Sequence, residues 1–209
     1  MIDSYEKLTI KKYKEVKEVV NSNMDEAQIK IDLVAVLNDM NTDDVEDLPV
    51  VTFNTLLQSS GFLMEEPKQR MVSTKYKLGG YELDVLMNLS KMSVAQYIDY
   101  QNYLQNVDEN LTQIISVFLI PKGKKYCEGY DVIDVQKAID ENMSIVDALS
   151  LSAFFLLWYQ SLTKGTITYL KRKMKWMKLT SRNKVEREKL KEVIANLETV
   201  GNGLRQLTE

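Results

Sequence analysis

The N-terminal part of the chain repeats apolar residues with the period of an α-helix. Apolar positions recur every three or four residues over 10–20, and Thr9 precedes them as an N-cap. A second helical pattern starts near Asp25 and runs to Met40. The short polar side chains of residues 41–44 compete with helical hydrogen bonds, so this segment predicts a turn.

The next segment predicts a short helix and then a β-hairpin. The residue before Pro49 avoids helical geometry, so helical structure should stop at Leu48-Pro49. A helix should follow over residues 51–59 and end at Gly61. Residues 71–86 alternate apolar and polar positions around a Gly-Gly pair, which allows the positive φ angles of a tight hairpin turn. An isolated hairpin is marginal in water, so we expect it to pack on helices or pair with another strand.

The second half of the chain is again helical in pattern. Ser93 and Ser144 each stand where an N-cap is expected. Pro121 should stop one helix, and residues 122–130 should form a loop. The predicted helices cover residues 93–104, 110–119, 131–141, 144–178 and 184–200.

These elements predict a mainly α fold: a helical domain with one inserted β-hairpin and a long basic C-terminal helix. Only eight glycines and three prolines are present, too few for the many tight turns of a sandwich or barrel. We expect a mainly helical domain over residues 1–165, with the hairpin at 71–86, and a basic helical extension over 166–209.

The composition argues against an enzyme. The chain has no histidine, so histidine-based triads and zinc sites cannot form. Cys127 is the one cysteine, and we expect a small packing residue there rather than a nucleophile. The acidic run 43–47 lacks the spacing of a calcium loop, and residues 122–125 lack the pattern of a phosphate loop. We therefore predict no catalytic residue, metal or cofactor.

One apolar stretch invites comparison with a membrane span. Residues 148–159 are strongly apolar, but a span needs about 20 such residues. A buried core helix is the better interpretation, and membrane contact is not favoured. The N-terminal residues lack the apolar region of a signal peptide, and a single free cysteine fits a reducing interior such as a cytoplasm.

Charge is distributed very unevenly along the chain. Residues 164–191 hold eleven Lys or Arg and two Glu, a net of +9, although the whole chain has a net charge of −3. Residues 24–66 hold ten acids and one lysine, a net of −9. The chain is therefore a charge dipole along its sequence, which is typical of a protein that binds a charged surface.

The basic end is the predicted contact surface. A helix over residues 144–178 would be about 50 Å long, and an apolar stripe at helical spacing accompanies its positive charges. The stripe comprises Phe155, Trp158, Tyr159, Leu162, Tyr169 and Leu170, and Trp176 and Met177 extend it. The residues predicted to bind a partner are Tyr169, Lys171, Arg172, Lys173, Lys175, Trp176, Lys178, Arg182 and Lys184.

Several interpretations of this surface stay open. It could hold nucleic acid through phosphate contacts, with Trp176 and Tyr169 stacking on bases. It could bind the acidic half of a sister copy, or shield an aggregation-prone apolar partner. It could also be a solvated helix folded against the chain's own acidic body, without any partner. We favour protein assembly, because a pI of 5.3 argues against nucleic acid.

The order of several short motifs resembles that of tailed-bacteriophage proteins. The motifs are Leu8-Thr9-Ile10-Lys11-Lys12-Tyr13, Leu48-Pro49, the hairpin from Tyr76 to Tyr81, and Met92-Ser93-Val94-Ala95-Gln96-Tyr97-Ile98-Asp99. The chain is similar to small proteins of the tail-assembly-chaperone type, and to virion components of phages that infect Bacteroides-like hosts. The likeness covers roughly residues 8–180 in its order of elements.

The resemblance implies a non-enzymatic assembly or structural protein that contacts other phage structural proteins and can form homo-oligomers. It would act in the host cytoplasm during assembly, or remain in the virion. The alternative is a ring, neck or cargo protein that contacts nucleic acid through its basic C-terminal helix. No catalytic residue carries over from these proteins.

Overall fold

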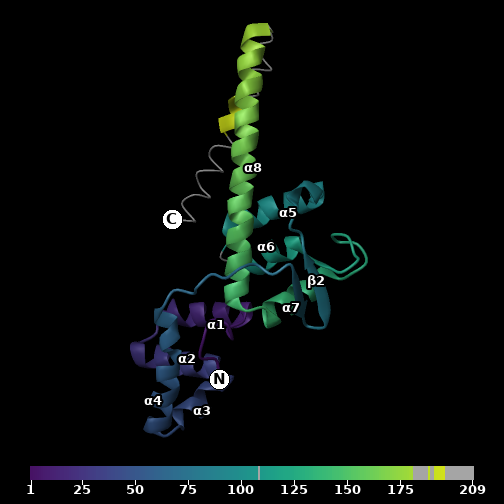
Figure 1. The fold of residues 1–209 in the computed structure, drawn as a ribbon. Helices are drawn as coiled ribbons and strands as arrows, with labels where there is room; N and C mark the ends of the chain where they lie inside the picture. Colours follow the sequence, from purple (N-terminus) through teal and green to yellow (C-terminus); the bar gives the residue numbers. More distant parts are fainter. Residues whose placement is uncertain (108, 181–187, 189–190, 196–209) are drawn as a thin grey trace. The chain divides into compact units, whose positions relative to one another are not determined.

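The computed structural model of the chain describes residues 1–107, 109–180, 188 and 191–195. The chain divides into two compact units, Met1–Ser152 and Ala153–Glu209. The fold is mainly α with one small antiparallel sheet, which confirms the predicted class (Figure 1). The predicted domain boundary near residue 165 stays a prediction.

The N-terminal helices begin where their caps predict. In α1 (Ile10–Val20) the Thr9 hydroxyl accepts a hydrogen bond from the Lys12 amide at 3.3 Å. In α2 (Glu26–Asn38) the Asp25 carboxylate accepts from the Gln28 amide at 2.8 Å. Both caps satisfy backbone donors that lack partners within the helix, so these two predictions are confirmed.

The predicted turn at residues 41–44 is wrong. The chain forms the short helix α3 (Thr42–Glu46), with Asp43 and Asp44 in its first turn. Acids there interact favourably with the positive end of the helix dipole, and Val45 is buried and anchors the helix. Next come α4 (Val50–Ser59) and the 3-10 helix η1 (Ser60–Met64), which continues through the predicted stop at Gly61.

The predicted hairpin is confirmed and gains a third strand. Strands β1 (Lys75–Leu78) and β2 (Tyr81–Val85) pair antiparallel around Gly79 and Gly80, whose φ angles are 53° and 86°. Strand β3 (Leu119–Pro121) pairs with the other edge of β2, so the helix predicted to reach residue 119 ends one residue earlier. The sheet order is β1-β2-β3.

The remaining helices of the first unit are close to their predicted ranges. Ser93 and Gln96 form a capping box at the start of α5 (Val94–Tyr103). Short 3-10 turns, η2 (Leu89–Lys91) and η3 (Leu104–Asn106), flank α5. Then follow α6 (Leu111–Phe118) and α7 (Val132–Asn142). Cys127 is exposed in the loop that joins β3 to α7 and has a φ of 57°, so its predicted role as a packing residue is wrong.

Helix α1 holds the first unit together. It packs against α2 on one side and α7 on the other, while α6 packs against α5 and α7. The Ile10 amide donates to the Met143 carbonyl at 3.1 Å, and the Ile145 amide donates to the Leu8 carbonyl at 2.7 Å. These bonds tie the N-terminal segment to the beginning of α8 (Ile145–Thr180), whose first turn is capped by Ser144.

Helix α8 extends into the second unit and continues through Gly165. Phe154 and Trp158 stack there, with ring centroids 6.2 Å apart. Much of the helix predicted over residues 184–200 lies outside the described residues. Within the part of the chain that is described, no helix has both the length and the apolar content needed to cross a bilayer.

Candidate functional site

Helices α2, α3 and α4 form an open apolar groove in the first unit. Val34 and Ala35 of α2 and Val45 of α3 are buried and make a small core of their own. Phe53 and Leu56 of α4 are only partly buried against it. The groove exists because α2 is apolar around much of its circumference. It can therefore contact α1 with one side and α3 and α4 with another.

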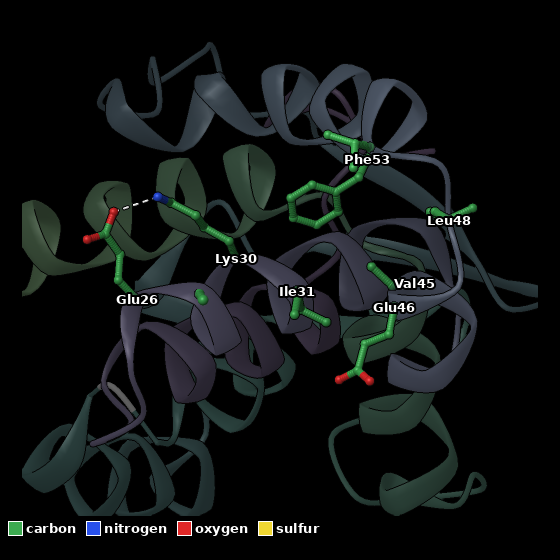
Figure 2. A pocket seen from close by; sticks show the side chains of 9 residues that line it. Glu26, Lys30, Ile31, Val45, Glu46, Leu48 and Phe53 are labelled. Carbon is green, nitrogen blue, oxygen red and sulfur yellow. Dashed lines mark hydrogen bonds and ion pairs between the residues drawn. The ribbon is translucent and has the colours of Figure 1, made fainter.

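The hollow of the groove has a volume of about 510 Å³. Figure 2 shows the Phe53 ring projecting from α4 toward Ile31 of α2 and Val45 of α3. The lining residues come from the three helices and the segment before α4: Glu26, Ala27, Lys30, Ile31, Val45, Glu46, Leu48, Val50 and Phe53. The surface is thus an apolar floor of side chains from separate elements, open on one side.

Helix α4 exposes an unusual amount of apolar surface. Its ten residues carry no charge, and none of its side chains is fully buried. Val50 is 73% exposed and Val51 is 79% exposed. Exposed apolar residues that stand singly are ordinary, whereas a group beside an apolar groove is typical of a binding surface. Helix α4 therefore offers a face that another molecule can cover.

The ends of the groove carry acids. Glu26 pairs with Lys30 at 2.5 Å, and the hydrogen bond from Lys30 lowers the pKa of Glu26. Glu46 lies at the opposite end of the cavity and is exposed (Figure 2). The acids of α3 and its C-cap, Asp43, Asp44 and Asp47, are also exposed. An apolar floor with a negative rim fits an amphipathic helix that carries positive charge.

The chemistry of the groove favours recognition of a macromolecule over a small ligand. Small-molecule sites bury most of the ligand's surface and fix its orientation with a few polar groups, whereas this groove is open and its lysine is already paired with Glu26. Among the described residues, no group of three or more Cys, Asp or Glu is placed to hold a metal ion.

A second hollow lies between the hairpin and the loop before α7. It measures about 490 Å³ and is lined by Gly80, Glu82, Lys122, Tyr130 and neighbouring residues. Glu82 pairs with Lys122 at 3.0 Å, and this pairing lowers the pKa of Glu82. In the same loop, the Tyr126 hydroxyl donates to Asp99 at 2.8 Å. These contacts hold the loop against its neighbours, so we assign the hollow a structural role.

The residues predicted to bind a partner lie in the second unit. Tyr169, Lys171 and Arg172 are exposed on α8. Lys173, Lys175, Trp176 and Lys178 belong to the same helix, but their side chains are outside the described part of the structure. Arg182 and Lys184 fall outside the described residues altogether. The prediction for this surface therefore stays a prediction.

Sequence reasoning missed the groove. Two signals were available: the uncharged, apolar composition of α4, and the concentration of acids over residues 24–66. Neither reveals a groove by itself, because residues 26–31 and 45–53 come together only when α2, α3 and α4 pack.

No protein family, no curated protein and no solved structure matches the chain.

Proposed function

We propose that the chain is a non-enzymatic assembly protein of a tailed bacteriophage, of the tail-assembly-chaperone type, that binds other phage structural proteins. The observation that carries the proposal is the groove of α2, α3 and α4. It combines an apolar floor with a helix whose own apolar residues stay uncovered. A surface of this kind can shield an apolar partner segment from aggregation until that segment is assembled.

The resemblance in motif order supports the same proposal independently of the groove. It implies protein contacts within phage assembly, which take place in the host cytoplasm. We expect the basic segment of α8, in which Lys171 and Arg172 are exposed, to act as a second binding surface, so that the protein can hold a partner and another molecule at once. Nothing in this mechanism requires a reacting side chain.

The test is co-purification of the full chain with the proteins encoded beside it in the genome. We expect at least one of them to bind, and Val50→Lys to weaken that binding by about tenfold or more, because a lysine there interrupts the apolar floor. Val94→Lys is the matched control. Val94 is also the first residue of a helix and is 75% exposed, but it does not line the groove.

Two outcomes would contradict the proposal. One is that none of the neighbouring proteins binds the full chain. The other is that Val50→Lys and Val94→Lys weaken binding equally, since the groove would then not be the contact surface. Circular dichroism of both variants, compared with the natural chain, verifies that each is folded.

The second candidate function is a virion component that contacts nucleic acid through α8. The net charge of +9 over residues 164–191 favours it. It predicts that binding to a short DNA duplex falls steeply as salt is raised. It also predicts that binding is lost when the basic residues Lys171, Arg172, Lys173 and Lys175 are made neutral. Measurable binding that is insensitive to salt would rule it out.

A further inference from the structure

We infer that the groove of α2, α3 and α4 receives the basic segment of α8, residues 169–178, from a second copy of this chain. The inference rests on the proposed function, since it names one occupant of the same groove. It pairs the acidic, apolar groove of one copy with the basic segment of α8 of the other.

The charges of the two surfaces are complementary. Residues 24–66, which contain the groove, have a net charge of −9, and residues 164–191 have a net charge of +9. Both groups include exposed members: Glu26 and Glu46 at the groove, and Lys171 and Arg172 on the helix. Opposite net charges of this size attract two copies to each other and orient them relative to one another.

The apolar parts are complementary as well. The segment 169–178 carries Tyr169 and Leu170, and then Trp176 and Met177 seven residues later, which is two turns of an α-helix. Its backbone is helical throughout. Residues at this spacing form the narrow stripe with which a helix lies in an apolar groove. The exposed valines of α4 beside Phe53 give that stripe a surface to cover.

This contact joins different surfaces of identical chains. Such a contact is heterologous, so each copy can donate its helix to one neighbour and accept a helix from another. Copies then form rings or open chains, unless two of them exchange helices reciprocally. In each case, association depends on protein concentration and weakens as salt screens the charges.

The experiment is light scattering of the full chain after size exclusion, at low and high salt and after nuclease treatment. It uses two charge-reversed variants. The groove variant carries Glu26→Lys and Glu46→Lys, and the helix variant carries Arg172→Glu, Lys175→Glu and Lys178→Glu. The groove residues are exposed, and glutamate forms helices about as well as arginine and lysine, so both variants should fold.

The expected results are specific to this pairing. The natural chain should exceed its monomer mass of 24.2 kDa increasingly with concentration. Each variant alone should stay close to that mass, because the residues that line its groove and its residues 169–178 then carry net charges of the same sign. An equimolar mixture should regain association, because the helix of each variant then meets a groove of opposite charge. Misfolded variants could not rescue each other in this way.

Three results would overturn the inference. The first is a natural chain that stays monomeric up to about 1 mM, where even a complex with a Kd of about 1 mM is well populated. The second is association that survives in the groove variant, and the third is association that disappears after nuclease treatment. The proposed function is tested separately, because Val50→Lys can abolish binding of a phage protein whether or not the chain binds itself.

Discussion

The Arg70 guanidinium forms two hydrogen bonds with the Asp147 carboxylate: Nε donates to Oδ1 at 2.7 Å, and Nη2 donates to Oδ2. The Ser144 hydroxyl also donates to Oδ2, and the Arg70 amide donates to the Ser150 hydroxyl at 3.0 Å. The hydrogen bond to Asp147 raises the pKa of Arg70. This cluster fastens the segment before β1 to the first turns of α8.

We expect Asp147→Ala to lower the free energy of unfolding by about 1.5–3 kcal/mol, the range for charged hydrogen bonds. The loss should stay below that of a fully buried ion pair, because the Arg70 side chain is 49% exposed and can turn to water. Urea unfolding measures the difference. Glu66→Ala, in an exposed loop, is the control and should change stability by less than about 0.5 kcal/mol. Equal losses would show that the cluster contributes nothing.

The hairpin turn provides a matched pair of glycines. Both have positive φ, so alanine costs about 1–2 kcal/mol at either position. A Cβ at Gly79 would in addition stand 2.7 Å from the Cβ of Ala138 on α7, whereas a Cβ at Gly80 would meet nothing within 4 Å. We expect Gly79→Ala to lower the melting temperature clearly more than Gly80→Ala. Equal effects would mean that the turn does not rest on α7.

The capping box of α5 can be tested at Ser93. Its hydroxyl accepts from the Gln96 amide at 3.2 Å, and the Gln96 side chain accepts from the Ser93 amide at 3.0 Å. Ser93→Ala should cost about 1 kcal/mol, whereas Ser93→Gly should cost only a few tenths. Chemical denaturation of both variants tests this order. The reverse order would indicate that the cap does not stabilise the helix.

Tyr126 should make the fold sensitive to alkaline pH. Burial, followed by the hydrogen bond to Asp99, raises the pKa of Tyr126 above its ordinary value of about 10. The unfolded chain therefore loses this proton at a lower pH than the folded chain does. The stability that Tyr126 contributes is fully present below about pH 10 and is lost as the pH rises further.

Unfolding measurements between about pH 8 and 11 test whether stability falls as the pH rises, since the unfolded tyrosine ionises near pH 10. Tyr126→Phe should lower stability by about 1 kcal/mol at the neutral end through loss of the hydrogen bond. It should also flatten the decline at the alkaline end. Tyr130, whose pKa burial also raises, should leave part of the decline in place. An unchanged slope in Tyr126→Phe would contradict the assignment.

Val50 should be dispensable for stability, although we propose that it contributes to partner binding. Since its side chain is 73% exposed, Val50→Ser should change the free energy of unfolding by no more than about 0.5 kcal/mol. Val34→Ala in the small core against which Phe53 and Leu56 pack should cost about 2 kcal/mol, because Val34 is 0% exposed. Thermal unfolding of both variants measures these two changes in stability. A large loss in Val50→Ser would assign Val50 to the core instead of a binding surface.

Local chemistry accounts for the parts of the fold that could be predicted. Thr9, Asp25, Ser93 and Ser144 cap their helices with side chains that reach amides only three residues away. The glycine pair of the hairpin acts over an equally short range. The same reasoning failed at residues 42–46, where the burial of Val45 under α2 and α4 decides in favour of a helix.

By itself, the sequence determined most of the described helices, the hairpin and the separation of acidic and basic regions, because periodicity, caps and charge are properties of neighbouring residues. Only the tertiary structure decided that Leu119–Pro121 becomes a strand, since its partner β2 lies more than 30 residues earlier in the chain. The groove was decided in the same way. Its floor brings Ile31 and Phe53 together from separate helices, and burial of apolar surface across such distances depends on how those helices pack.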